Sequence, residues 1–453
     1  MPKISVIMPV LNMVDYFEEC LQSVLQQNCT DLEILVVDAG STDGTLEIIE
    51  DWKKNDNRIQ LLHSKKRSYG YQVNLGLDVA QGEYIGIVDT DDMLTENAYA
   101  VLLDAIVNNQ LDYVKGYAKL YWKFENGRSF SADFINFFIK ENIHNQVICP
   151  SEFPNLIVKD HFLWQGLYSK KLLKGIRLNE TAGAAYQDQG FCLQVYAAAQ
   201  RAMYIDYPVY LYRQNNETSS TYNKNGLEFV ANEFELNQSK LSGLGAAWHT
   251  NFYLRLWDSC QGRFEQMAAC GNYWSHATDS MERIKVMFKD AICHGYLGEE
   301  DFSGNKWNLL QYFMEEPQKV YHNILEKHEN VLESVTMLLN QIQGAEVVIV
   351  GCGVRGRFLC ALLLNNQISV KTYCDNNEAL YGEKRDGISI MSLQDAVSTN
   401  SSAKFVISSN TFYKELYKQL IDLQVDKSNI LSYDAPIDYR LLLNNFLAIP
   451  EIQ

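Results

Sequence analysis

The sequence predicts an α/β protein in which two α/β regions flank a helical region. In the first hundred residues, short runs rich in Ile and Val alternate with helix patterns, and the same alternation returns at about residue 346. The stretch from about residue 225 to residue 340 has long amphipathic runs and a single proline, Pro317, which indicates helices. We therefore expect three parts, at residues 1–220, 221–340 and 341–453.

Four apolar runs in the first part predict buried strands, largely parallel, because strands covered on both faces are apolar throughout. They are ISVIMPV (4–10), LEILVVD (32–38), IQLLHS (59–64) and YIGIVD (84–89). Helix patterns between them imply right-handed crossovers in an open sheet. Ligands bind such sheets at the carboxyl ends of the strands, and we expect the polar loops there to meet in one crevice. Those loops are LNMVD (11–15), DAGSTDG (38–44) and DTDD (89–92).

Three carboxylates, on Asp89, Asp91 and Asp92, crowd the end of one apolar run in a chain of net charge −17. Like charges repel at this spacing, and burial raises the cost of ionising them. Acidic turn and cap residues alone would explain the pattern. The alternative is a divalent cation on Asp89 and Asp91, since Mg²⁺ and Mn²⁺ prefer oxygen ligands and are often shared with substrate phosphates. Such an ion would neutralise a diphosphate as a leaving group.

Composition narrows the function classes. A pI near 5.0 argues against a nucleic-acid-binding protein, because no overall positive field attracts phosphate backbones. The ten cysteines contain no CxxC pair and predict reduced thiols. We see neither a signal peptide nor a run of about twenty apolar residues, and we expect a cytoplasmic protein. Peripheral membrane association and a homo-oligomer stay open.

Four stretches together resemble family 2 glycosyltransferases: PKISVIMPVLN, VVDAGSTDGT, NLGLDVAQGEYIGIVDTDD and the later YQDQGF. The resemblance covers about residues 1–220. It implies the GT-A fold and transfer of a sugar from a nucleotide-diphosphate donor. The acceptor would be a glycan, either lipid-linked or protein-linked, and the family favours an inverting reaction with Mn²⁺ or Mg²⁺ as cofactor.

The resemblance also implies which residues contact the donor. The expected set is Pro9, Val10, Leu11 and Asp38 around the nucleoside, Arg67 at the base or phosphates, Asp89 and Thr90 at the ribose or metal, Asp91 at the metal, and Arg213 at the diphosphate. We expect Arg213 to lie in a loop, with a surface salt bridge as the alternative. Many relatives have a second acid after Asp38 that binds uracil, and Ala39 cannot do so. A UDP sugar is nevertheless the donor we favour.

The family's catalytic base lies in a Glu-Asp pair, which here is Gln187-Asp188. One carboxylate is enough to take the proton of the acceptor hydroxyl, so we expect Asp188 to be the base. Its alternative role is a helix-start residue favoured by the helix dipole. Trp164 would line the acceptor side or pack in the core, and Asp43 would cap the next helix.

The last part contains Gly351, Gly353 and Gly356 in GxGxxG spacing after an apolar run, with Asp375 further on. This pattern resembles a Rossmann-like domain, in which the glycines admit a phosphate to a helix N-terminus and the acid binds a ribose. We expect either a nucleotide or dinucleotide here, or a structural, docking or oligomer-forming domain.

Three rival functions stay open. A nucleotidyltransferase usually has a glycine-rich loop after the first strand, which VLNMVDYF lacks. A non-catalytic nucleotide-sugar-binding or scaffolding subunit would account for Gln187 and Ala39. An NAD-dependent oxidoreductase built on the last part lacks visible catalytic residues.

Overall fold

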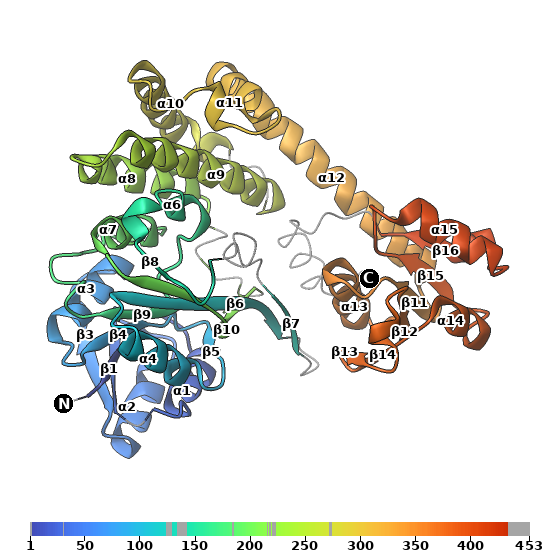
Figure 1. Cartoon of the computed structure of the whole chain (residues 1–453), viewed down its shortest axis with the longest axis horizontal. Helices are drawn as coiled ribbons and strands as arrows, with labels where there is room; N and C mark the ends of the chain where they lie inside the picture. Colours follow the sequence, from blue (N-terminus) through green and yellow to red (C-terminus); the bar gives the residue numbers. More distant parts are fainter. Residues whose placement is uncertain are drawn as a thin grey trace. The chain divides into compact units, whose positions relative to one another are not determined.

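The computed structural model forms two compact units (Figure 1). Unit 1 comprises residues 1–120, 133–267 and 272–320, and unit 2 comprises residues 121–132, 268–271 and 321–453. The structure describes residues 2–29, 31–123, 129–133, 143–183, 185–214, 216, 219, 223–270 and 274–433. The helices that follow residue 220 therefore group mainly with the N-terminal sheet, whereas the sequence division treats them as a separate part.

A ten-stranded sheet organises unit 1, with the main order β3-β2-β1-β4-β9-β6-β10-β5. The first four strands along the chain are parallel, and β9 runs antiparallel to β4 and β6. The strands are β1 (Ile4–Val10), β2 (Leu32–Asp38), β3 (Ile59–His63), β4 (Tyr84–Ile87), β5 (Met93–Leu94), β6 (Tyr113–Lys123), β7 (Ser129–Asp133), β8 (Val147–Ile148), β9 (Gly166–Ser169) and β10 (Ala202–Arg213). The α/β class predicted from the sequence is confirmed.

The apolar runs form strands because helices cover both faces of the parallel half of the sheet. Every residue of β1 and β2 is buried, and Val10 pairs with Asp38 at their carboxyl ends. The connecting helices are α1 (Phe17–Leu25), α2 (Thr45–Asn55), α3 (Tyr69–Val79) and α4 (Ala98–Asn108). In α1 the buried side chains include Phe17, Leu21 and Val24, the face that the helical spacing predicts.

A helical layer completes unit 1 (Figure 1). Its helices are α6 (Leu156–Lys159), α7 (Asp188–Ala198), α8 (Gly226–Gln238), α9 (Ala246–Cys270), α10 (Thr278–Cys293), α11 (Lys306–Glu315) and the start of α12 (Pro317–Ile342). Short 3-10 helices are η1 (Pro150–Glu152), η3 (Ser239–Leu241), η4 (Trp274–His276) and η5 (Glu299–Asp301). None of the helices in the described ranges has the length and apolar character that a bilayer crossing requires.

Unit 2 contains a second sheet with the order β13-β14-β12-β11-β15-β16. The central strand β11 is parallel to both neighbours. The elements are β11 (Val347–Val350), α13 (Val354–Asn365), β12 (Val370–Cys374), η6 (Glu378–Leu380), β13 (Lys384–Arg385), β14 (Ile388–Met391), α14 (Leu393–Thr399), β15 (Lys404–Ile407), α15 (Tyr413–Asp422), η7 (Lys427–Asn429) and β16 (Ile430–Ser432). The expected C-terminal tail, residues 434–453, lies outside the described residues.

A buried ion pair joins the antiparallel half of the sheet to the helical layer. Lys115 on β6 donates hydrogen bonds from Nζ to Asp160 Oδ2 at 2.8 Å and to the Tyr196 hydroxyl of α7 at 2.7 Å. Gln165 donates to the other oxygen of Asp160 at 2.7 Å. Neither charged side chain is accessible to solvent, so each depends on these partners to offset its lost hydration.

We predict that Lys115→Met lowers the free energy of unfolding by about 3–5 kcal/mol, because Asp160 then keeps a buried charge without its cation. Urea denaturation followed by tryptophan fluorescence measures the loss. The control is Lys3→Met, which breaks the exposed pair of Lys3 with Glu83 and should cost at most about 1 kcal/mol. Equal losses in the two variants would contradict a structural role for the buried pair.

Candidate functional site

The first two loops at the carboxyl edge of the sheet are hydrogen-bonded to each other. The Asn12 amide donates to Ser41 Oγ at 2.9 Å, and the Thr42 amide donates to Asn12 Oδ1 at 2.8 Å. Asp43 accepts from the Val14 amide and from the amide of Thr45, the first residue of α2, each at 3.0 Å. The N-cap of α2 is Gly44 and not Asp43, so Asp43 lies one residue before the cap and connects the first loop to the start of the helix.

The residues expected around the nucleoside also accept hydrogen bonds that connect the loops. Val10 O accepts from the Ala39 amide at 3.0 Å, and Pro9 O accepts from Thr90 Oγ1 at 3.0 Å. Asp38 is buried and its carboxylate accepts from the Gly40 amide at 2.9 Å. Thr90 thus ties the acidic loop to the end of β1, so the three polar loops meet at one edge of the sheet. Contacts of Pro9, Val10, Leu11, Asp38 and Thr90 with a donor stay predictions.

Two carboxylates of the acidic loop, on Asp89 and Asp91, are half-buried. Asp89 Oδ1 accepts from the Tyr69 hydroxyl at 2.7 Å, and Asp91 Oδ2 accepts from Asn216 Nδ2 at 2.8 Å. Burial and the neighbouring charge of Asp91 raise the pKa of Asp89 to about 7, and burial also raises the pKa of Asp91. Asp92 is fully buried and accepts from the Arg213 amide at 2.7 Å. Asp89 and Asp91 are therefore the members of this trio that a ligand can reach.

The oxygen donors of this pair fit a hard divalent cation, whose positive charge would offset the burial of both carboxylates and the repulsion that Asp91 exerts on Asp89. Within the described residues, no three or more His, Cys, Asp or Glu side chains are grouped to hold a metal ion. The two carboxylates would consequently need further oxygen ligands from water or from the phosphates of a substrate.

Arg213 lies at the last position of β10 and not in a loop, which corrects the sequence expectation. The alternating pattern of β10 runs through YLYR to this residue. Its buried guanidinium donates to Glu19 Oε2 at 2.8 Å and to the backbone oxygen of Asp91 at 2.7 Å. Arg213 therefore fixes the acidic loop. In its ion pair with Glu19 the arginine is buried and the glutamate is half-buried.

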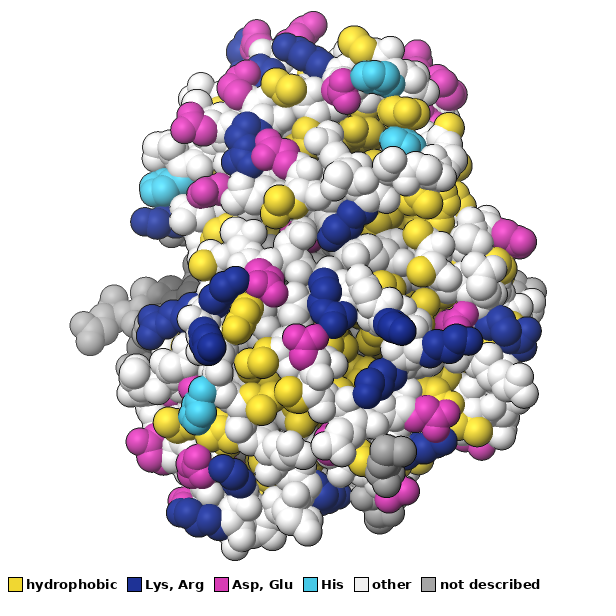
Figure 2. All heavy atoms as spheres, turned by 90° about the vertical axis from the view of Figure 1, so that its left-hand side faces the viewer, with side chains coloured by type: hydrophobic (Ala, Val, Ile, Leu, Met, Phe, Trp, Pro, Cys, Tyr) yellow, Lys and Arg dark blue, Asp and Glu magenta, His cyan; other side chains and the backbone are white. Residues whose placement is uncertain are grey.

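Arg67 lies in the segment before α3, and its side chain is exposed. Figure 2 shows Lys and Arg side chains gathered in the middle of one face, although the chain is acidic overall. Basic segments at residues 64–68 and 169–177 flank α3, where Lys66 pairs with Glu180 and Arg177 pairs with Asp78, each at 2.8 Å. Contact between Arg67 and a donor stays a prediction.

Asp188 is the first residue of α7, and α8 holds this end of the helix. Glu233 on α8 accepts from the Gly190 amide at 3.2 Å, which satisfies one of the unpaired donors of the first turn. A Cβ on Gly190 would lie 2.4 Å from the Asn237 side chain and 2.6 Å from the Glu233 side chain, so a larger residue here requires both side chains to shift. The position of Asp188 therefore depends on packing by the helical layer.

The carboxylate of Asp188 is chemically suited to accept a proton. Burial raises its pKa to about 7; Arg255 opposes the rise and Glu233 adds to it. Asp188 Oδ1 is buried without a hydrogen-bond partner among the described residues. The charge of Asp188 also contributes to the raised pKa of Asp89. The candidate base and the candidate metal ligand therefore lie within electrostatic reach of each other.

The Gln187 side chain forms two hydrogen bonds that hold the backbone, whereas the neighbouring Asp188 is the candidate base. The side chain is buried; Oε1 accepts from the Gly70 amide at 2.8 Å and Nε2 donates to Thr181 O at 3.2 Å. Gly70 follows Tyr69, whose hydroxyl binds Asp89. An amide at position 187 therefore connects the start of α7 to the start of α3, and a carboxylate could not make both hydrogen bonds while ionised.

Trp164 packs in the core, as the alternative expectation has it. It is 6% exposed, and its ring stacks on Tyr210 with 4.2 Å between centroids. The Tyr210 hydroxyl in turn accepts from the Asp89 amide at 3.0 Å. Half-buried Phe162 and Tyr212 lie against the same indole. Trp164 thus packs against Tyr210, which contacts the acidic loop. Contact between Trp164 and an acceptor stays a prediction.

Sequence reasoning missed several residues of this site. Tyr69, Tyr210 and Asn216 contact the acidic loop, and Glu233 and Arg255 act on Asp188. They come from elements far apart in the chain and belong to no short motif. The only sequence signal was the high number of tyrosines in the chain, 27 in all, which packing also explains.

The glycine-rich turn of unit 2 is tight, and its polar groups are hydrogen-bonded within the unit. Gly351 has a φ of 98°, and a Cβ on Gly356 would lie 2.0 Å from the oxygen of Gly351. Asp375 Oδ2 accepts from the Cys352 amide at 3.0 Å, and Arg385 donates to Cys352 O at 2.9 Å. This use of Asp375 within the turn favours the structural alternative. Nucleotide binding by Gly351, Gly353, Gly356 and Asp375 stays a prediction, as does the Rossmann-like assignment.

Two family models match the chain. The model described as "Glycosyl transferase family 2" matches residues 5–146, and the model described as "C2185-like, N-terminal" matches residues 344–431. The first covers the parallel strands and the acidic loop. The second covers most of unit 2.

Curated relatives resemble the N-terminal half. The uncharacterized glycosyltransferase EpsJ of Bacillus subtilis (strain 168) is 30% identical over 222 residues, which is 47% of this chain and 62% of EpsJ, less than two thirds of its length. Glycosyltransferase GlyG of Streptococcus pneumoniae serotype 4 is 30% identical over 217 residues, 47% of this chain and 71% of GlyG.

The fold resembles that of S. aureus TarS 1-349, solved in complex with UDP-GlcNAc, with a TM-score of 0.54 and 20% identity. The match covers 72% of this chain and 92% of the TarS fragment. This share exceeds the first 220 residues, so the similarity of fold extends beyond the expected transferase part.

We predict that Gln187→Glu lowers the free energy of unfolding by about 1–3 kcal/mol, because the hydrogen bond to Thr181 O is lost. Burial would raise the pKa of the new carboxyl in the folded state, so the loss should be small in acid and grow between about pH 5 and pH 8. Urea denaturation at several pH values measures it, with the exposed Gln394→Glu of α14 as control. A loss independent of pH would contradict the burial argument.

Proposed function

Because the chain belongs to glycosyl transferase family 2, we propose that it is a metal-dependent, inverting glycosyltransferase. It transfers a hexose or N-acetylhexosamine from a UDP donor to a hydroxyl of a glycan or glycoconjugate. The observation that carries the proposal is a pair of hydrogen bonds from consecutive residues of α3. The Tyr69 hydroxyl donates to Asp89 and the Gly70 amide donates to Gln187, which holds the acidic loop near Asp188. The pKa values of Asp89 and Asp188 are both raised to about 7. A base and an acidic donor loop in one crevice are what sugar transfer requires.

On the donor side, Asp89 and Asp91 would hold Mg²⁺ or Mn²⁺. When bound, the ion supplies charge neutralisation for the departing diphosphate. The UDP-GlcNAc complex of TarS supports a uridine donor for a chain of similar fold. Asp38 and the first loop would surround the nucleoside, and the exposed Arg67 would approach the phosphates.

On the acceptor side, the hydroxyl oxygen attacks the anomeric carbon of the donor sugar while its proton passes to Asp188. The bond between that carbon and the diphosphate oxygen breaks, and the nucleoside diphosphate leaves with the electron pair. A single displacement inverts the anomeric configuration, and one positioned base serves it. The raised pKa of Asp188 suits this role, since a base works best with a pKa near the working pH.

The remaining assignments belong to the same proposal. The glycan-assembly role and a cytosolic location are supported by the family and by described cysteines that form no disulfide. Unit 2 would serve as a structural or docking part, because Asp375 is already bound within its own glycine turn. The hydrogen bonds of Gln187 give the amide a structural reason, which weakens the non-catalytic alternative.

We predict that Asp91→Asn abolishes transfer and weakens UDP-sugar binding, because an amide is a poor ligand for a hard dication. Transfer should require Mg²⁺ or Mn²⁺ and stop on addition of EDTA. Calorimetry gives the donor affinity and product analysis gives the transfer rate. Asp51→Asn, at an exposed pair with Lys54, is the control. Full transfer by metal-free wild-type protein would overturn the metal assignment.

We predict that Asp188→Asn lowers turnover about a hundredfold or more, the usual contribution of a general base, and leaves donor affinity nearly unchanged. In the wild type the rate should depend on the unprotonated form of Asp188. It should therefore be lost as the pH falls through an apparent pKa of about 7. A pH–rate profile measures this. Near-normal turnover by the variant would place the base elsewhere, with His161 as the next candidate, because Asp92 is fully buried.

A further inference from the structure

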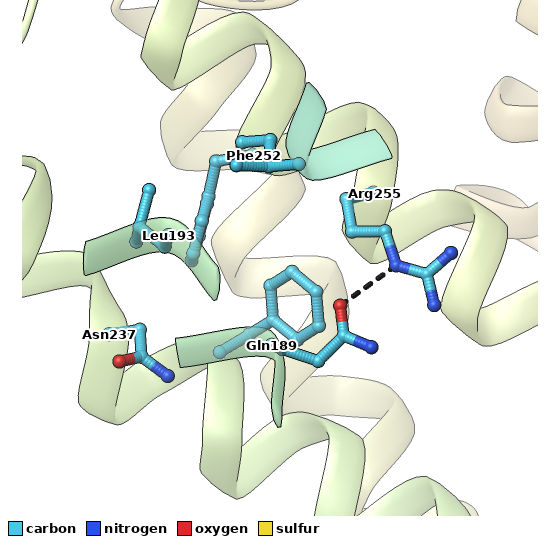
Figure 3. A pocket seen from close by; sticks show the side chains of 7 residues that line it. Gln189, Leu193, Asn237, Phe252 and Arg255 are labelled. Carbon is cyan, nitrogen blue, oxygen red and sulfur yellow. Dashed lines mark hydrogen bonds between the residues drawn. The ribbon is translucent and has the colours of Figure 1, made fainter. Parts of the chain in front are cut away.

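Helix α9 contacts the chain on both sides of the proposed base. Arg255 Nε donates to Gln189 Oε1 at 2.9 Å, one residue after Asp188 (Figure 3). The guanidinium of Arg263, two turns further along α9, lies over the ring of Tyr186 at 4.4 Å. Two arginines from the helical layer thus flank the carboxylate, and nothing in the transfer chemistry itself uses them.

The guanidinium of Arg255 has donors to spare. Its hydrogen bond to Gln189 uses Nε alone, and in Figure 3 the two terminal nitrogens extend beyond this bond. Burial lowers the pKa of Arg255, and the carboxylates of Asp258 and Asp188 oppose this change. Neither carboxylate forms an ion pair with Arg255 in the described part of the chain. A half-buried guanidinium without a close counter-ion is costly unless a ligand supplies one.

The residues around Arg255 indicate the chemical class of such a ligand. Arg255 forms a polar wall of a small pocket between α6, α7, α8 and α9 (Figure 3). The other lining residues are Ile157, Gln189, Leu193, Phe234, Asn237 and Phe252. Burial and the charges of Arg255, Lys115 and Arg263 lower the pKa of His161, which disfavours a positive charge on its ring. Arg255 is therefore the cationic donor of this pocket, beside the neutral amides of Gln189 and Asn237.

We propose that Arg255 binds an anionic group, a phosphate or a carboxylate, on the acceptor whose hydroxyl Asp188 deprotonates. This inference rests on the proposed transfer function and names its acceptor class. The planar fork of a guanidinium matches two oxygens of either group in a bidentate contact, which a neutral glycan cannot offer. In a chain of net charge −17, an anionic acceptor needs such a local cation to reach a carboxylate base.

Anion binding would also act on the base. The positive charge of Arg255 opposes the rise in the pKa of Asp188, so it weakens the base while it stays uncompensated. A bound anion would screen that charge and strengthen the base only when an acceptor is present. Arg255 would then both bind the acceptor and serve as a positioning residue for Asp188.

The test titrates inorganic phosphate, and separately acetate, into the full chain with UDP and Mg²⁺ already bound. Calorimetry should detect saturable binding that Arg255→Gln weakens about tenfold or more, the usual worth of a charge-assisted hydrogen-bonded pair. Arg255→Lys keeps the charge but loses the fork, so it should bind with intermediate affinity. Arg283→Gln on α10, whose partner is Glu235, is the control with the same change in charge.

The outcomes separate the sources and the hypotheses. Phosphate binding without acetate binding assigns a phosphorylated acceptor, and the reverse assigns a carboxylated one. Equal anion affinity in the wild type and Arg255→Gln, or no saturable binding at all, overturns the inference. Failure of the wild type to bind UDP would instead refute the proposed function, so the two failures are distinguishable. Circular dichroism confirms that each variant is folded, and the Lys variant keeps the test valid if the Gln variant is not.

Discussion

The repulsion among carboxylates at the end of β4 is the constraint on which the rest of the site depends. Asp89, Asp91 and Asp92 cannot all keep a charge at this spacing without compensation. The protein supplies that compensation as hydrogen-bond donors from three directions. They are Tyr69 on α3, Arg213 at the end of β10 and Asn216 beyond it. Strand β10 pairs with β5, which directly follows the acidic loop, so the end of β10 is placed where its residues can hold that loop.

The same constraint reaches the proposed base through a short chain of contacts. Tyr69 and Gly70 are consecutive residues at the start of α3; one holds Asp89 and the other holds Gln187. Asp188 follows directly, and Glu233 on α8 secures its helix from the opposite side. Donor loop, base and helical layer are therefore one mechanically connected assembly within unit 1.

The sequence predicted those features that depend on local pattern. Buried strands are apolar throughout, and polar loops at their carboxyl ends must meet, so the crevice and the acid pair followed from periodicity and spacing. Features set by tertiary contact could not be predicted. The strand position of Arg213 depends on pairing across the sheet, and no local motif links Arg255 to Gln189. Trp164 shows the same limit, because an aromatic residue suits a sugar face and a core equally until Tyr210 is found stacked upon it.

The glycine at position 190 has a consequence for how such enzymes diversify. It leaves room for the side chains of Asn237 and Glu233 against α7, so these side chains of α8 and the start of α7 fit each other. Recombination that exchanged α8 and α9 between relatives would therefore bring in a new acceptor surface together with a misfitted base. Acceptor preference in this lineage is consequently expected to drift by single side chains on α9, while the α7–α8 joint is inherited as a block.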